Sequence, residues 1–492
     1  MLRSSLRFSA AATLGCLAFL LFAAVLSSCS LPNGEGRGGA SSYPSLIYED
    51  SLLRNPSILG GIYAAYPDNP QQELTPAPEG YVPFYVSLYN RHGSRYQPND
   101  SRYQNTLDRL LDGHERGVLT PYGESLIPRI QQLCDSCLGH GGMLTRVGER
   151  QLRTIGRRMA EHFPEVFAQT RPDGTPKSIY ARSSTSPRCA ASMHAFLDGL
   201  YSVAGSNFPA SPFEGEEKGS VMSYIAYDTP AMRALSAKDA PWQDAYSDYK
   251  YSHVSRDRFI QAIYTDATGV DTLQMAIDLY WLVVGMQDVD VPDCDLSDVF
   301  TPEELLQCYQ CVNYRMYICN GNWPDSHDVP RHSASTLLQN IVDCADAAIE
   351  TDTCCADLRF GHDSNLLRLL ALIRMHNAAL QCGDPAQAWQ LWQEYTLSPM
   401  AANLQLVFYR STADAQAETA AQPSANVTAE SSAHAPAAPI LVKLLHNEHE
   451  VLLDTDLRPV IGPYYEWTSL RSYFLSQIVD EETDDVSTIN VQ

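Results

Sequence analysis

The apolar positions between residues 81 and 89 predict a strand that is buried on both faces. The alternating set from Val82 to Leu88 is apolar, and the set between these positions is largely apolar too, as in strands of α/β sheets with helices on both sides. The run ends at a polar cluster, Arg91-His-Gly-Ser-Arg95. Ligands of open α/β sheets bind beyond the carboxyl ends of the strands, so the pattern predicts a functional site directly after this strand.

Other segments predict the rest of an α/β core. Residues 178–182 and 358–360 each form a short apolar strand that leads into a polar turn and then into a helix. Two further strands are predicted late in the chain, at 400–409 and 440–445. Strands that alternate with helices are typical of α/β domains. The expected fold is therefore α/β, with a central, mostly parallel sheet flanked by helices.

A helical period replaces the strand pattern between residues 201 and 352. Amphipathic segments there are separated by Gly, Pro and Asp, without an alternating parallel-strand pattern. We therefore expect an inserted all-α cap at 201–352 and an α/β core formed by residues 46–200 and 353–492. Within the core, Thr145 is suited to cap a helix that Pro164 ends. The helices predicted inside the insertion are 255–264, 270–285, 302–317 and 333–350.

The first 29 residues have the pattern of an export signal. Two arginines precede a long apolar run that leads to Leu26-Ser-Ser-Cys29. This ending resembles the lipobox of bacterial lipoproteins, which implies a signal peptide over 1–28, a lipidated Cys29 and a flexible tether over 29–45. The protein would then be extracytoplasmic and lipid-anchored to a bacterial membrane, on the periplasmic side or at the cell surface. An ordinary export signal or an uncleaved anchor is the alternative. Residues 46–79 follow as an irregular lead-in.

The cysteine content of an exported chain predicts disulfides. Two of the 13 cysteines lie in the first 29 residues, which leaves 11, so at least one is expected to be free or paired between chains. The spacings Cys134-Asp-Ser-Cys137 and Cys308-Tyr-Gln-Cys311 leave a zinc site as an alternative, although partner histidines are not near them in the sequence. The local bridges that we expect in loops are among Cys294, Cys308, Cys311 and Cys319.

The acidic composition limits the partners. A net charge of −24 argues against nucleic acid and against electrostatic capture by anionic membranes. An anionic substrate would also be repelled at long range, so such an activity requires a locally basic cleft. Residues 411–439 are rich in Ala, Ser, Thr and Glu, and we expect them to form a disordered insertion at a hairpin tip.

The polar cluster after the first strand has the composition of a phosphate site. Arg91 and Arg95 each offer a planar fork of donors that can pair two oxygens of a tetrahedral dianion. A neutral His92 between them can attack phosphorus. The segment Arg91-His-Gly-Ser-Arg95 resembles the RHGxR signature of the histidine phosphatase superfamily, in the branch of histidine acid phosphatases, phytases and multiple inositol-polyphosphate phosphatases. The lead-in Tyr81-Val-Pro-Phe-Tyr-Val86 is most similar to bacterial members of the last group.

A second polar turn follows the strand at 178–182. The resemblance implies a third phosphate-binding arginine eight residues before a helical phenylalanine, and Arg188 stands in this position before Phe196. Arg182, where the strand ends, is a candidate accessory residue. The alternative for Arg188 is a solvated surface charge.

The turn Gly361-His362-Asp363 is the second chemical element. It resembles the HD motif of histidine acid phosphatases and phytases, which implies phosphate binding by His362 and proton donation by Asp363. Asn365 is a further candidate accessory residue. Members of the inositol-polyphosphate group usually carry HAE here, so the subfamily stays open. A second pair, His327-Asp328, lies in a polar loop without a preceding strand, and we favour His362-Asp363.

The late segment His446-Asn-Glu-His449 has a spacing that a metal site could use. The apolar residues on both sides favour a hairpin instead, with Asn447 and Glu448 in the turn. No cofactor is expected, because the arginines supply the charge that metal ions supply in other phosphoryl-transfer sites.

Together these patterns predict a phosphomonoester hydrolase that works through a phosphohistidine on His92. The expected substrates are inositol polyphosphates, phytate included, at acidic pH, because positive neighbours keep His92 neutral in acid. One alternative is a broad-range acid phosphatase for sugar phosphates or phosphoglycerates. Another is a non-catalytic surface lipoprotein that binds phosphorylated ligands, although such a binder has no use for the leaving-group acid Asp363.

Overall fold

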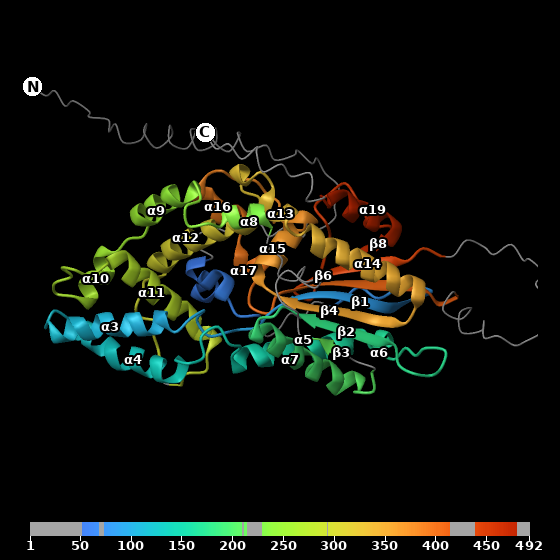
Figure 1. The fold of residues 1–492 in the computed structure, drawn as a ribbon, viewed down its shortest axis with the longest axis horizontal. Helices are drawn as coiled ribbons and strands as arrows, with labels where there is room; N and C mark the ends of the chain where they lie inside the picture. Colours follow the sequence, from blue (N-terminus) through green and yellow to red (C-terminus); the bar gives the residue numbers. More distant parts are fainter. Residues whose placement is uncertain are drawn as a thin grey trace, which may run out of the picture. The chain divides into compact units, whose positions relative to one another are not determined.

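One mixed sheet forms the centre of the described structure (Figure 1). Its eight strands are β1 (Tyr81–Arg91), β2 (Ser178–Ser183), β3 (Ser211–Phe213), β4 (Cys354–Gly361), β5 (Asn403–Ser411), β6 (Leu441–His446), β7 (His449–Val451) and β8 (Tyr464–Glu466). Their order is β3-β2-β4-β1-β5-β6-β7, and β8 pairs with β6. The first four in this order are parallel neighbours. β5 is antiparallel to β1, and β6 returns to the direction of β1. The predicted α/β class is confirmed.

The computed structural model describes residues 52–67, 73–208, 211–213, 229–292, 294–413 and 438–479. The predicted signal peptide (1–28), Cys29, the tether (29–45) and most of the insertion predicted at 411–439 lie outside these ranges and stay predictions. None of the helices in these ranges is both long and apolar enough to cross a membrane.

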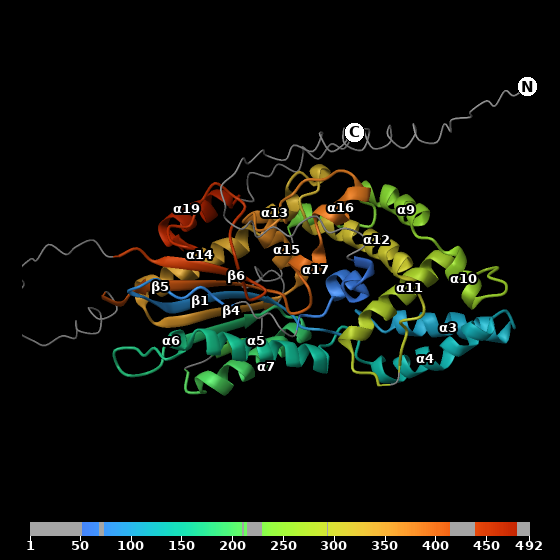
Figure 2. The ribbon, with the colours of Figure 1, turned by 180° about the vertical axis from the view of Figure 1, so that it is seen from behind.

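Helices cover both faces of the sheet (Figure 1, and Figure 2 from behind). One face carries α5 (Arg146–His162), α6 (Pro164–Phe167) and α7 (Pro187–Ala204), and the other carries α14 (Ser335–Thr351), α15 (Asp363–Leu372) and α19 (Trp467–Gln477). The side chains of β1 alternate between the two layers. Val86 and Leu88 pack with α5 and α7, while Tyr85 and Tyr89 pack with the opposite layer. The double burial predicted for this strand is confirmed.

The remaining helices pack beside the sheet. They are η1 (Pro56–Tyr63), α3 (Ser101–Glu115), α4 (Pro121–Cys137), α8 (Pro230–Leu235), α9 (Trp242–His253), α10 (Asp257–Ile263), α11 (Thr272–Gly285), η3 (Met286–Asp288), α12 (Pro302–Asn320), η4 (Pro324–Ser326), α13 (Val329–His332), α16 (Pro385–Leu391) and α17 (Glu394–Leu397). α3 packs on α11 and α4 on α10, whereas α14 packs on β1 and β4. These contacts cross the boundaries predicted at 200 and 352. The sequence does not show them, because a helical period predicts that one face of a helix is buried but not against which neighbour.

Local signals fix several element ends. The side chain of Thr145 accepts a hydrogen bond from an amide of the first turn of α5, as predicted for its cap. β6 and β7 form a hairpin in which His446 lies opposite His449. Asn447 and Glu448 form the turn with positive φ angles of 50° and 66°. The hairpin predicted for this segment is therefore confirmed.

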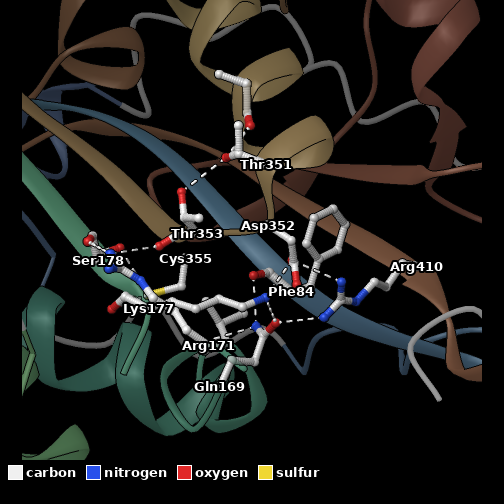
Figure 3. Close-up of polar contacts among 12 residues, drawn as sticks. Phe84, Gln169, Arg171, Lys177, Ser178, Thr351, Asp352, Thr353, Cys355 and Arg410 are labelled. Carbon is white, nitrogen blue, oxygen red and sulfur yellow. Dashed lines mark hydrogen bonds and ion pairs between the residues drawn. The ribbon is translucent and has the colours of Figure 1, made fainter. Parts of the chain in front are cut away.

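A polar cluster around the buried Lys177 joins three strands at the end of the sheet where β2 and β4 begin (Figure 3). Lys177, 1% exposed, donates to Oε1 of Gln169 at 2.9 Å and forms an ion pair with Asp352. Arg410, in β5, pairs with the same carboxylate at 2.9 Å and donates to Gln169 at 3.0 Å. These contacts fix the starts of β2 and β4 against β5.

The described cysteines correct the disulfide prediction. Cys308, Cys311 and Cys319 are buried within α12 and belong to its apolar core, not to loops. Small thiols are common in such cores. No group of three or more His, Cys, Asp or Glu side chains that could hold a metal occurs in the described ranges. The cysteines expected to form local bridges are free thiols: Cys294, Cys308, Cys311 and Cys319.

Candidate active site

The carboxyl ends of β1 and β4 bring the two predicted chemical turns together. Arg91 lies opposite Gly361 in the parallel register, and the amide of His92 donates to the carbonyl of Gly361 at 3.0 Å. The rings of His92 and His362 meet edge to face, with centroids 5.8 Å apart. Turns that are distant in the sequence therefore form one site.

His92 has the state that a nucleophile requires. The residue is 2% exposed, and its Nδ1 lies 2.9 Å from the carbonyl oxygen of Gly93. Because a carbonyl oxygen only accepts, Nδ1 carries the hydrogen and Nε2 keeps its lone pair. Burial lowers the pKa of His92 well below 6.5, and the neighbouring arginines, Arg91 foremost, lower it further. The imidazole is therefore neutral in acid and able to attack phosphorus.

Arg91 donates hydrogen bonds to two main-chain carbonyls. Its Nη1 donates to the oxygen of Ile62 at 2.7 Å and to that of Ser398 at 2.6 Å. The residue is fully buried, and its Nε and Nη2 have no protein partner among the described residues. Buried donors are costly to leave unpaired. These two nitrogens form the fork that can bind a pair of phosphate oxygens.

Arg95 contacts Tyr63 through a hydrogen bond and through the face of the ring. Its Nη1 donates to the hydroxyl oxygen of Tyr63 at 2.9 Å, and its guanidinium carbon lies 4.9 Å from the centroid of the same ring. The hydroxyl of Tyr63 in turn donates to Oε1 of Gln97 at 3.3 Å. Tyr63 directly follows Ile62, so η1 supports both arginines of the motif.

Arg188 contacts His362, the second histidine of the site. Nη2 of Arg188 donates to Nδ1 of His362 at 3.2 Å, and Oγ of Ser184 lies 3.1 Å from Nε2. Burial lowers the pKa of His362 to about 4, with Arg188 as the next cause. The structure thus places Arg188 next to the predicted HD pair, with a buried Nε that has no partner in the described residues.

Asp363 begins α15 beside these groups. Burial alone would raise the pKa of Asp363, but the positive charges nearby, Arg91 first, outweigh this effect and lower it. The first turn of a helix also favours a carboxylate. Asp363 is therefore ionised when no phosphate is bound. The charge of a bound phosphate has to offset the arginines before Asp363 can act as an acid.

Arg182 and Asn365 are the two predicted accessory residues. Nη1 of Arg182 forms an ion pair with Oδ1 of Asp357 at 3.0 Å, and the same carboxylate accepts the hydroxyl of Tyr85 at 2.9 Å. Arg182 therefore has a carboxylate partner within the sheet, and its assistance to phosphate binding stays a prediction. Asn365 is buried in α15, and its role stays a prediction.

The sequence analysis missed η1. This segment lacks a hydrophobic period, so the sequence predicts only an irregular lead-in, yet it supplies the contacts to both motif arginines. A usable signal is the pair Gly60-Gly61. Gly61 has a φ of 56°, and a side chain there would collide with the carboxylate of Glu394. Such a glycine marks a place where the backbone must pass close to a neighbour.

A cavity of about 490 Å³ begins at Arg95 and extends between the helices beside the sheet. Three further cations line it, Arg102 from α3, Lys250 from α9 and Arg315 from α12, against a single carboxylate, Asp271. The guanidinium of Arg102 lies over the ring of Trp281, 4.7 Å from its centroid. The region beside the site is therefore locally basic in a chain that is acidic overall.

A sheet whose strand ends gather a neutral histidine, three arginines and a carboxylate defines a phosphatase site that uses histidine. Residues 85–421, more than half of the chain, match the histidine phosphatase superfamily (branch 2). The chain belongs to this superfamily and is a phosphomonoester hydrolase.

Solved structures share this fold. The multiple inositol polyphosphate phosphatase of Bifidobacterium longum in complex with phosphate has 16% identity and a TM-score of 0.64, over 86% of this chain and 99% of its own. Its complex with inositol hexasulfate has 16% identity and a TM-score of 0.63, over 84% and 97%. The phytase from D. castellii has 15% identity and a TM-score of 0.62, over 90% of both chains. No curated protein sequence matches. At these identities the likeness shows the fold alone.

Proposed function

We propose that the protein hydrolyses phosphate monoesters in two steps through a phosphohistidine on His92. The observation that supports this most is a buried, neutral imidazole whose free Nε2 lies among arginines. Arg91, Arg95 and Arg188 would hold the non-bridging oxygens and stabilise the charge of the transferred group. Asp363 would protonate the leaving oxygen and then, as a carboxylate, activate the water that releases phosphate.

We further propose that the substrates are inositol polyphosphates, used at acidic pH. The basic cavity beside Arg95 supports this, because a substrate with several phosphates could place one at His92 and others against Lys250 and Arg315. It also resolves the conflict between an anionic substrate and a chain of net charge −24. The inositol polyphosphate phosphatase and the phytase that share the fold agree with this choice.

A broad-range acid phosphatase for sugar phosphates or phosphoglycerates is the second candidate. The His362-Asp363 pair leaves this candidate open, because it resembles the HD motif of histidine acid phosphatases and phytases and not the HAE usual in the inositol-polyphosphate group. A substrate with a single phosphate needs only the arginines around His92 and makes no use of the basic cavity. The two candidates therefore differ in how much Lys250 and Arg315 contribute.

The test is the double variant Lys250→Gln/Arg315→Gln. Charge-assisted contacts contribute about 1.5–3 kcal/mol each, so kcat/KM for inositol hexakisphosphate should fall at least ~10-fold. The value for nitrophenyl phosphate, which has one phosphate, should stay within ~2-fold. Arg157→Gln, which removes an exposed cation paired with Glu161 on α5, is the matched control. Equal losses for both substrates, or none, would favour the second candidate.

We also propose that the protein is exported and anchored through lipid on Cys29. The support is the sequence Leu26-Ser-Ser-Cys29 after an apolar run. A lipid anchor would hold the phosphatase at a membrane, on the periplasmic side or at the cell surface.

A further inference from the structure

Glu394 carries a buried carboxyl group next to the segments whose carbonyls accept hydrogen bonds from Arg91. It begins α17 and is fully buried. Neither of its carboxylate oxygens has a hydrogen bond of good geometry among the described residues, although the hydroxyl of Tyr309 is near enough to lower the pKa of the group. A buried charge without a partner is costly, so this environment suits the neutral acid.

Glu394 belongs to one of the two segments that hold Arg91 and contacts the other. On one side its Oε1 is packed against Gly61, where any side chain would collide with it; the next residue, Ile62, gives its carbonyl to Arg91. On the other side the carbonyl of Glu394 accepts the amide of Ser398 at 2.7 Å, and Ser398 gives its own carbonyl to Arg91. The carboxyl group, carried by α17, therefore packs directly against η1.

The titratable groups around Glu394 are phenols. Its charge influences Tyr280 of α11, Tyr309 of α12 and Tyr395 of α17. No cation contributes to its pKa within the described part of the chain, and burial raises this pKa to about 8. The group is therefore neutral in acid and at neutral pH.

We propose that Glu394 is a positioning residue that acts only as the neutral acid, keeping η1 and α17 together so that both carbonyls stay on Arg91. Ionisation places an unpaired charge between the two segments. The structure then favours states in which η1 moves away and water reaches the carboxylate, and Arg91 loses one of its two supports. This inference rests on the proposed function, because the task of Arg91 is to hold the phosphate that His92 attacks.

The test is Glu394→Gln, an uncharged group of the same shape at every pH. The quantity to measure is kcat/KM for nitrophenyl phosphate, taken at each pH as the ratio of variant to wild type, so that titrations common to both proteins cancel. The ratio should stay within ~2-fold of one from pH 5 to 7 and rise to ~10 at pH 9, one pH unit above the folded-state pKa. A ratio that does not change with pH would mean a merely structural role and overturn the proposal.

Asp288→Asn is the matched comparison. Asp288 is another fully buried acid, with Arg91 and Arg95 close enough to lower its pKa, and burial raises this pKa to about 7. If Asp288→Asn reproduces the rise at pH 9 and Glu394→Gln does not, the responsible acid is Asp288 and the proposal is wrong. If the ratio of kcat/KM rises at pH 9 for Glu394→Gln and not for Asp288→Asn, the proposal stands.

Thermal unfolding separates this inference from the proposed function. The folded-state pKa of Glu394 lies above its unfolded value of 4.5, so its contribution to stability is complete below pH 4.5 and is lost as the pH rises to about 8. The Tm of the wild type should therefore fall more than that of Glu394→Gln between pH 5 and 8. This readout needs no turnover. Parallel Tm curves would overturn the inference even in an active enzyme, whereas a wild type without phosphatase activity would refute the proposed function and leave the Tm result interpretable.

Discussion

Replacing Tyr63 by phenylalanine removes one oxygen from beneath Arg95 and leaves the ring in place. The lost hydroxyl accepts from Nη1 of Arg95 at 2.9 Å and donates to Gln97 at 3.3 Å. The contact between the guanidinium and the ring, 4.9 Å from the centroid, is kept. Tyr63→Phe therefore isolates the hydrogen bond from the packing of this buried side chain.

The expected effect follows from the kind of bond that is lost. A hydrogen bond to a charged group contributes about 1.5–3 kcal/mol, and about 1.4 kcal/mol corresponds to a tenfold change in rate. Because Arg95 is assigned to the transferred phosphate itself, Tyr63→Phe should lower kcat/KM by ~10- to 100-fold. The loss should be similar for inositol hexakisphosphate and for nitrophenyl phosphate. The Tm should change by ~4 °C or less.

The assay is steady-state kinetics with both substrates, together with thermal unfolding. The control is Tyr473→Phe, which removes a hydroxyl on α19 that donates to the carbonyl of Ile373 at 3.2 Å; its kcat/KM should not change. If kcat/KM of Tyr63→Phe stays within ~2-fold of the wild type, η1 does not position Arg95. A large loss of Tm together with the loss of rate would mean that the hydroxyl serves stability and not the site.

Three further predictions concern Asp363, the ionisation of His92 and the lipid anchor on Cys29. Asp363→Asn should lower the single-turnover rate of phosphorylation by an inositol phosphate ~10²- to 10⁴-fold and by nitrophenyl phosphate much less, since a nitrophenolate leaves without a proton; equal losses would exclude Asp363 as the acid. Because the pKa of His92 is lowered well below 6.5, kcat/KM should show no loss near pH 6.5 as the pH falls, and a loss centred there would contradict a buried neutral nucleophile. The wild type should partition into the detergent phase and Cys29→Ala should not; a wholly soluble wild type would refute the lipid anchor.

The strand and the turns of the site were predictable because their signals are local. A run that is apolar at both alternating sets predicts double burial, and β1 has it. The polar residues that end such a strand must lie at the edge of the sheet. His92 and His362 were therefore expected at the same edge, and the resemblance to the histidine phosphatases implied that they share one pocket; their ring centroids lie 5.8 Å apart.

The support of the site could not be predicted, because it depends on contacts between distant segments. Ile62 acts through a main-chain carbonyl, which leaves no trace in the type of side chain. Arg182 was assigned to the site from its place near a strand end, but its partner Asp357 lies on the adjacent strand β4 and is known only from the register. Cys308 and Cys311 suggested a bridge in a loop, although three-residue spacing also fits a buried helix, which is what α12 provides.

The most direct test of the central claim is detection of the covalent intermediate. The wild type is mixed with substrate labelled on its phosphate, quenched within milliseconds in alkaline detergent, digested, and examined by mass spectrometry for a phosphorylated peptide that contains His92. The wild type should carry an acid-labile phosphate on His92, and folded His92→Ala should show neither label nor turnover. Turnover that persists in His92→Ala, or a label on another residue, would contradict the central claim.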